Sequence, residues 1–152
     1  MSLLTNPLYI ANNLTFESGA NSFNNSISSK DVTVGGDLRF INEQVKMGAS
    51  TWTIYGNFYS TSAATNLYAN IASYTTIKME GTNKNLFYVD DNATLARGLG
   101  NITINGDTTI PAAANFRVQG VLMLATNKTL TNNVSVIGAV QLFHGGDLKV
   151  QS

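Results

Sequence analysis

A short pattern of alternating apolar residues followed by a glycine recurs along the chain. It reads apolar–x–apolar–x–Gly in ten-residue frames that begin at Asp31, Thr51, Asn101, Asn115 and Asn133. The apolar residues alternate with period two, which indicates strands that bury one face. A glycine at the same phase inside a strand pattern marks a bend. A chain with such a repeat is expected to fold as a stack of similar coils.

The glycines of these frames set the length of the repeat. They are Gly36, Gly56, Gly106, Gly120 and Gly138, and a weaker copy of the frame ends at Gly81. We expect the five frame glycines to occupy equivalent corners. Most steps between successive glycines are close to the length of one turn of a β-solenoid, but the step from Gly106 to Gly120 is clearly shorter. That short step is either a compact coil or an error of register. The segment Gly35–Phe40 also returns almost unchanged as Gly145–Val150.

We predict one all-β domain over residues 1–152, a right-handed parallel β-helix of about six to seven coils. The hand follows from the rule that parallel crossovers are almost always right-handed. Val45–Met47 and Leu86–Val89 are candidates for third strands of the coils. The alternative is an antiparallel β-sandwich or jelly roll, which even strand spacing also fits. Hairpin signals are scarce, however, and occur only around Asn105-Gly106.

The chain stops in the middle of a strand pattern, at Leu148–Ser152. An uncovered strand edge pairs readily with other chains. We therefore expect either a fragment of a longer rod or a protomer whose edge is covered by another copy, with end-to-end stacking or a homo-oligomer as the result.

The polar residues of the chain are mostly uncharged. Charged residues make up 12% of the chain, about half the usual share of roughly 25%. Asn, Thr and Ser instead number 19, 17 and 12. Neutral amides and hydroxyls can lie above one another in successive layers, whereas like charges on neighbouring strands repel. Asn also accepts the left-handed backbone of tight corners. This composition suits a stack of near-identical coils.

Charge and composition argue against several classes of function. The net charge is 0 and no run of Lys or Arg occurs, so we expect neither nucleic acid nor an anionic membrane as partner. The absence of cysteine excludes disulfides, zinc-thiolate sites and a Cys nucleophile. No apolar run approaches the roughly 18 residues that cross a bilayer. Walker and Rossmann fingerprints are missing, and we expect no cofactor and no metal.

Two segments resemble the repeats of large β-solenoid surface proteins: Ser50–Phe58 (STWTIYGNF) and Asn101–Gly106 (NITING). Similar repeats are typical of adhesin-like proteins, of autotransporter-type passengers, and of phage tail and fibre proteins. The resemblance extends from Leu14 to Val150 and is generic, so it names no single family. It implies an extracellular location, on a cell or virion surface, and a non-catalytic structural or adhesive role.

A cluster of tyrosines is the candidate binding surface. Its members are Tyr55, Tyr59, Tyr68 and Tyr74. In the period-two frame, Trp52 and Phe58 point inward, whereas Tyr55 and Tyr59 are out of phase with them and either point outward or lie at corners. Exposed aromatic rings stack on sugars and are enriched at interfaces. The expected partner is a surface glycan or a protein receptor; otherwise the tyrosines fill a wide coil and its loop.

Candidates for catalysis are few. His144, the single histidine, lies shortly before Asp147, but no Ser or Cys nucleophile motif accompanies this pair. Asp90, Asp91 and Arg97 are similar to the acid-and-cation clusters of glycan-cleaving β-helices. Adjacent strand residues point to opposite faces, so a polar turn is the expected role of the acidic pair. A carbohydrate-binding or glycan-cleaving β-helix module remains the alternative function.

Overall fold

The computed structural model describes residues 5–17, 23–24, 29–41, 45–60, 75–89, 99–114, 117–118, 120–133, 141–142 and 147–150. These residues form an all-β parallel β-solenoid of about four turns with strands on three sides, and further strands extend its two main sheets. Every pairing between the described strands is parallel. The predicted parallel solenoid is therefore confirmed, and the antiparallel sandwich is wrong.

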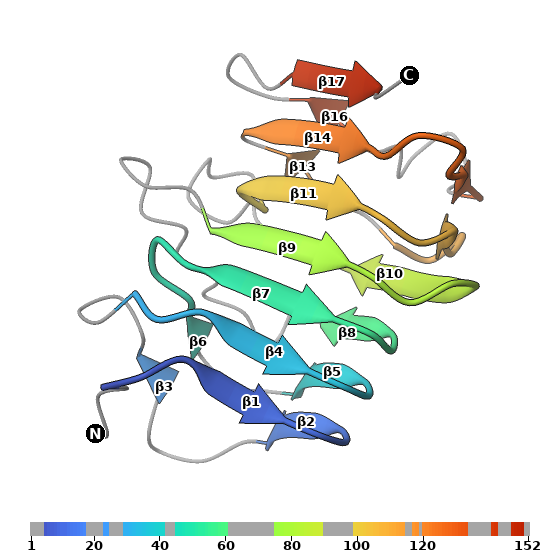
Figure 1. The fold of residues 1–152 in the computed structure, drawn as a ribbon. Coiled ribbons are helices and arrows are strands. Elements are labelled where there is room, and N and C mark those ends of the chain that lie inside the picture. Colours follow the sequence, from blue (N-terminus) through green and yellow to red (C-terminus); the bar gives the residue numbers. More distant parts are fainter. Residues whose placement is uncertain are drawn as a thin grey trace.

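The first main sheet has seven strands, which lie one above another and run in the same direction (Figure 1). In order across the sheet they are β1 (Leu8–Ile10), β4 (Val32–Val34), β7 (Thr51–Ile54), β9 (Thr76–Met79), β11 (Asn101–Ile104), β14 (Val121–Leu124) and β17 (Asp147–Val150). Their alternating apolar and polar residues account for their burial pattern, which is buried–intermediate–buried in β4 and intermediate–buried–intermediate–buried in β7. One face of this sheet is therefore buried in the core, as the period-two pattern predicts.

The second main sheet has six strands, each of which follows the corner after a strand of the first sheet. In order they are β2 (Leu14–Glu17), β5 (Leu38–Ile41), β8 (Phe58–Ser60), β10 (Lys84–Tyr88), β12 (Thr108–Ile110) and β15 (Leu130–Asn132). Before β5, β8, β10 and β12 this corner contains a glycine. Short strands follow on a third side in two pairs. These are β3 (Phe23–Asn24) with β6 (Val45–Lys46), and β13 (Arg117–Val118) with β16 (Gln141–Leu142).

The register of the first sheet gives the true length of each turn. One column of residues in register comprises Leu8, Val32, Trp52, Ile77, Ile102, Leu122 and Leu148. The shortest steps along this column, from Val32 to Trp52 and from Ile102 to Leu122, are equal in length. Both are longer than the step from Gly106 to Gly120. The short step between these two frame glycines is therefore an error of register and not a compact coil.

The expected equivalence of the five frame glycines is wrong for Gly120. Gly36, Gly56 and Gly106 each follow a strand of the first sheet, at the corner that leads to the second sheet. Gly120 instead precedes β14 and follows β13, so it lies at the opposite end of the first-sheet strands. The same local pattern thus occurs at two different corners of the coil. Gly138 lies outside the described residues.

Two further segments lie on a different side of the coil from the one that their sequence suggests. The near-repeat of Gly35–Phe40 at Gly145–Val150 does not mark equivalent strands, because Leu38 lies in β5 of the second sheet and Leu148 in β17 of the first. Leu86–Val89 does not supply a third strand either, since it falls mostly in β10 of the second sheet. The prediction for Val45–Met47 is confirmed, as β6 lies on the third side.

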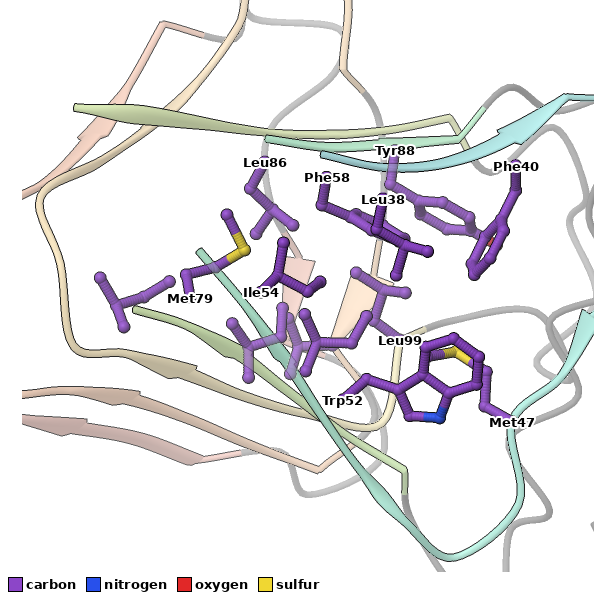
Figure 2. Packing of buried hydrophobic residues seen from close by; sticks show 14 of the residues in the cluster. Leu38, Phe40, Met47, Trp52, Ile54, Phe58, Met79, Leu86, Tyr88 and Leu99 are labelled. Atoms are coloured by element: carbon purple, nitrogen blue, oxygen red, sulfur yellow. The ribbon is translucent and has the colours of Figure 1, made fainter. Parts of the chain in front are cut away.

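The core fills the space between the sheets with apolar side chains from successive turns (Figure 2). Trp52, Phe40 and Phe58 are completely buried. The ring of Phe40 meets the other two edge-on, with centroids 6.1 Å from Trp52 and 5.6 Å from Phe58. Edge-to-face contacts add to the stabilisation that burial alone provides. The aromatic layers therefore join the first and second sheets into one dry core.

Two buried serines form a matched pair for testing this core. The Ser50 hydroxyl accepts a hydrogen bond from Trp52 Nε1 (3.0 Å) and donates one to the Met47 carbonyl oxygen (2.7 Å). Ser60 is completely buried, and its hydroxyl has no hydrogen-bond partner among the described residues. A buried polar group without a partner keeps its desolvation cost.

We expect Ser60→Ala to leave the free energy of unfolding unchanged or to raise it by up to about 1 kcal/mol, because the lost hydroxyl makes no hydrogen bond to a described residue. Ser50→Ala should lower the free energy of unfolding by about 1–3 kcal/mol, because it leaves the Trp52 N–H unpaired. Urea denaturation followed by circular dichroism measures both. Equal losses in the two variants would show that Ser60 has a partner after all.

Candidate functional site

Asn and Asp side chains link the turns at the corner before the second sheet. We call Asn13, Asp37, Asn57 and Asn85 the corner ladder. The Oδ1 atom of each of the first three accepts a hydrogen bond from the backbone N–H of the next, at 2.7, 2.8 and 2.9 Å. These bonds satisfy backbone donors that the bend leaves without a strand partner. Asn side chains therefore lie above one another in successive turns, as the composition predicts.

Asn also occupies positions with a left-handed backbone, as its tolerance of that conformation predicts. Asn83 has a φ of 57° and Asn127 a φ of 59°. Both lie in turns between two strands, Asn83 before β10 and Asn127 before β15. The left-handed region costs Asn less than most residues.

Two carboxylates are held in their ionised form on the outside of the solenoid. Burial raises the pKa of Asp37, but hydrogen bonds from Asn57 and the guanidinium of Arg39 outweigh it and bring this pKa below its usual range. Burial likewise raises the pKa of Glu80, and the contacts with Lys78 Nζ (2.6 Å) and Asn105 Nδ2 (3.0 Å) more than reverse that change. Each carboxylate therefore favours the folded state only while it is ionised.

Acid should therefore weaken the fold through Asp37 and Glu80. A group with a depressed folded-state pKa contributes its stabilisation above its unfolded pKa, about 3.9 for Asp and 4.3 for Glu, and loses it as the pH falls through the folded value. We expect the free energy of unfolding, measured with urea between pH 7 and pH 3, to fall less steeply in the Asp37→Asn/Glu80→Gln variant than in the natural chain. Parallel pH profiles would contradict this assignment.

A hollow of about 390 Å³ lies on the outer face of the second sheet, over β5, β8 and β10; we call it the outer hollow. Its apolar walls are Ile41, Tyr59, Phe87 and Pro111. Tyr59 and Phe87 occupy the same position in neighbouring turns, and their rings stack with centroids 4.8 Å apart and an angle of 11° between the planes. The solenoid register thus places two aromatic rings side by side on an outer face.

The polar wall of the outer hollow comes from the corner ladder and from Arg39. Asp37, Asn57 and Asn85 line it, and Arg39 Nη2 contacts Asp37 Oδ2 at 2.9 Å. Arg39 is in register with Tyr59, so its guanidinium lies one turn from the aromatic pair. The hollow therefore combines aromatic rings, amides and an internally neutralised ion pair, which suits binding and offers no free acid–base pair among its described lining residues.

The predicted tyrosine cluster is only partly described by the structure. Tyr55 and Tyr59 are exposed, by 49% and 38%, whereas Trp52 and Phe58 are buried, as the period-two frame predicts. Tyr59 lines the outer hollow, but Tyr55, which follows β7 at the corner, does not. Tyr68 and Tyr74 lie outside the described residues.

The catalytic candidates fall on parts of the chain that the structure does not describe. His144, Asp90, Asp91 and Arg97 all lie there, and of Asp147 only the backbone strand is described. Within the described ranges, no three His, Asp or Glu side chains gather as metal ligands would. The same ranges hold no helix with the length and apolar character of a membrane span.

Sequence reasoning missed Arg39, Asn85 and Phe87 as residues of the outer hollow. The signal for Phe87 is its place between the inward residues Leu86 and Tyr88, which puts its ring on the outer face. Recognising that it lies beside Tyr59 requires the register between two turns, which neither segment contains. No family model, curated protein or solved structure matches the chain.

Proposed function

We propose that the protein is a non-catalytic structural or adhesive module, a segment of a β-solenoid rod at the surface of a cell or virion. The observation that carries this proposal is the parallel stack of the first sheet, in which seven described strands follow one another in chain order. Such stacks are quasi-one-dimensional and each turn contacts its neighbours, so they make spacers and extended display surfaces.

The proposal extends to the hand of the coil, the number of coils and self-association. We infer a right-handed coil, because parallel crossovers take that hand, with one coil for each strand of the first sheet, or six to seven in all. Self-association also fits, since β1 and β17 each have one neighbour among the described strands and an open strand edge favours pairing.

The described outer surface supports a role in display more than in chemistry. Its outward columns contain Thr, Asn and a few ion pairs, such as Lys78 with Glu80, and the described carboxylates with shifted pKa values are held ionised by their partners. A glycan-cleaving site needs two carboxyl groups with different protonation states. The outer hollow favours carbohydrate binding as the second candidate function, because it joins aromatic rings and amides.

Incubation of the purified chain with a panel of plant, bacterial and animal polysaccharides, with and without calcium, tests this proposal. We expect no release of reducing ends or of unsaturated sugars above the level of a heat-unfolded sample. Light scattering and small-angle X-ray scattering in the same buffer should report an elongated particle. Saturable release of sugar products would overturn the non-catalytic role.

A further inference from the structure

We propose that the outer hollow binds a neutral, extended oligosaccharide, with Tyr59 and Phe87 as its apolar platform. This inference rests on the adhesive form of the proposed function and assigns the ligand class to one face. The two rings stand on neighbouring turns with centroids 4.8 Å apart. That spacing is close to the rise of one sugar unit along an extended β-linked chain, so successive units would meet equivalent positions of successive turns.

Other side chains that line the hollow lie on both sides of the aromatic pair. Arg39 lies one turn before Tyr59 in the sheet register, and Pro111 lines the same hollow beside Phe87. A sugar ring has apolar C–H faces and a polar rim, and aromatic or planar side chains match such faces. Together these residues form a column of planar or apolar side chains that runs along the axis of the stack, across the strands.

Hydrogen-bonding groups for sugar hydroxyls lie beside this column. Asn85 is exposed and lines the hollow, and its backbone N–H donates to Asn57 Oδ1, which fixes the position of the residue. Arg39 Nη2 donates a hydrogen bond to Asp37 Oδ2. Among the described residues this is the bond that the guanidinium makes, so its other N–H groups can donate to a ligand. Amides and guanidinium groups of this kind fix the orientation of a ligand in an otherwise apolar site.

The charge of the hollow selects a neutral ligand. Among its described lining residues, the single cation, Arg39, is paired with the single anion, Asp37, at 2.9 Å. An anionic glycan or a nucleic acid would need an unpaired cation. A peptide strand would need a free strand edge, but β8 has β5 and β10 on its two sides. A neutral sugar chain needs neither an unpaired cation nor a free strand edge, and its hydroxyl groups can form hydrogen bonds with the amides and the guanidinium of the hollow.

A glycan array with neutral, sialylated and sulfated members, followed by calorimetric titration with cellohexaose, chitohexaose and xylohexaose, tests the inference. We expect binding to at least one neutral β-linked chain and a loss of affinity of about tenfold or more in Tyr59→Ala and in Phe87→Ala. Asn85→Ala, at an exposed position, should also weaken binding. The matched control is Tyr9→Ala, because Tyr9 is 70% exposed but lies on the first sheet.

Three results would overturn the inference: no neutral glycan bound, binding confined to the anionic glycans, or an equal loss of affinity in Tyr9→Ala. Circular dichroism distinguishes a variant that misfolds from one that folds but binds less tightly. If an aromatic variant misfolds, the affinity of Asn85→Ala still tests the inference. Failure to bind any glycan would refute this assignment and leave the structural rod intact, whereas sugar release would refute the non-catalytic role itself.

Discussion

Replacing Gly56 with alanine is expected to lower the free energy of unfolding by about 3 kcal/mol or more, enough to unfold much of the protein. A Cβ at this position would overlap the backbone carbonyl of Gly36 and the backbone N of Asp37 in the turn below. Those atoms cannot withdraw, because the Gly56 N–H donates to the Gly36 oxygen at 2.9 Å and holds the turns together. The strain must therefore separate two turns.

Urea denaturation followed by circular dichroism measures this loss. The control is Thr82→Ala, since Thr82 is exposed in a turn and its change should leave the midpoint within the error of the measurement. Gly106→Ala should behave as Gly56→Ala does, because its Cβ would meet the Gly81 carbonyl. A Gly56→Ala variant as stable as the natural chain would mean that these glycines do not lie directly above one another.

Trp52→Ala should cost about 3–5 kcal/mol, as truncation of a large buried side chain usually does. The indole is completely buried and contacts the rings of Phe16, Phe23 and Phe40, with centroids 6.0 to 6.5 Å away. Its removal would leave a cavity between the two sheets and deprive Ser50 of the indole N–H that its hydroxyl accepts. This side chain thus joins three turns at once.

Thermal and urea unfolding of Trp52→Ala, followed by circular dichroism, gives the size of this effect. Trp52→Phe is the matched variant, and we expect it to lose less than half as much, because it keeps an aromatic ring in the layer. The natural chain has a single tryptophan, so its fluorescence should be blue-shifted when folded and move to the red on unfolding. A solvent-like emission maximum in the folded protein would contradict the buried position.

The inward face of each turn could be predicted from sequence because it depends on local alternation. Val32, Val34, Leu38 and Phe40 follow the period-two frame on both sides of a glycine, and all four are completely buried. The pattern repeats because each turn must fill the same interior with apolar side chains. Parallel stacking follows from the repeat itself.

The position of each frame along the coil could not be predicted in the same way. Alternating strands flank a glycine both at Gly56, between the two main sheets, and at Gly120, between a short third-side strand and the first sheet. The two corners share one local sequence pattern, so glycine spacing alone placed Gly120 in the wrong column. The turns also differ in length along the stack, which leaves room for such a shift.

The outer hollow depends on contacts between turns, which is why its residues were only partly foreseen. Tyr59 was singled out by its phase, but its stacking partner Phe87 belongs to the next turn of the chain and its neighbour Arg39 to the preceding one. Their proximity is fixed by the register of β5, β8 and β10. No local pattern in one turn contains this information.

Pairs of cysteines test the parallel register most directly, because the natural chain has none. In the structure Thr51 is in register with Thr76, and Thr53 with Lys78, all four with outward, partly exposed side chains. The account predicts rapid disulfide formation on mild oxidation in Thr51→Cys/Thr76→Cys and in Thr53→Cys/Lys78→Cys. It predicts little in the crossed pairs Thr51→Cys/Lys78→Cys and Thr53→Cys/Thr76→Cys, which are farther apart than a disulfide spans. Faster formation in the crossed pairs would mean that the two strands run in opposite directions and would contradict the solenoid.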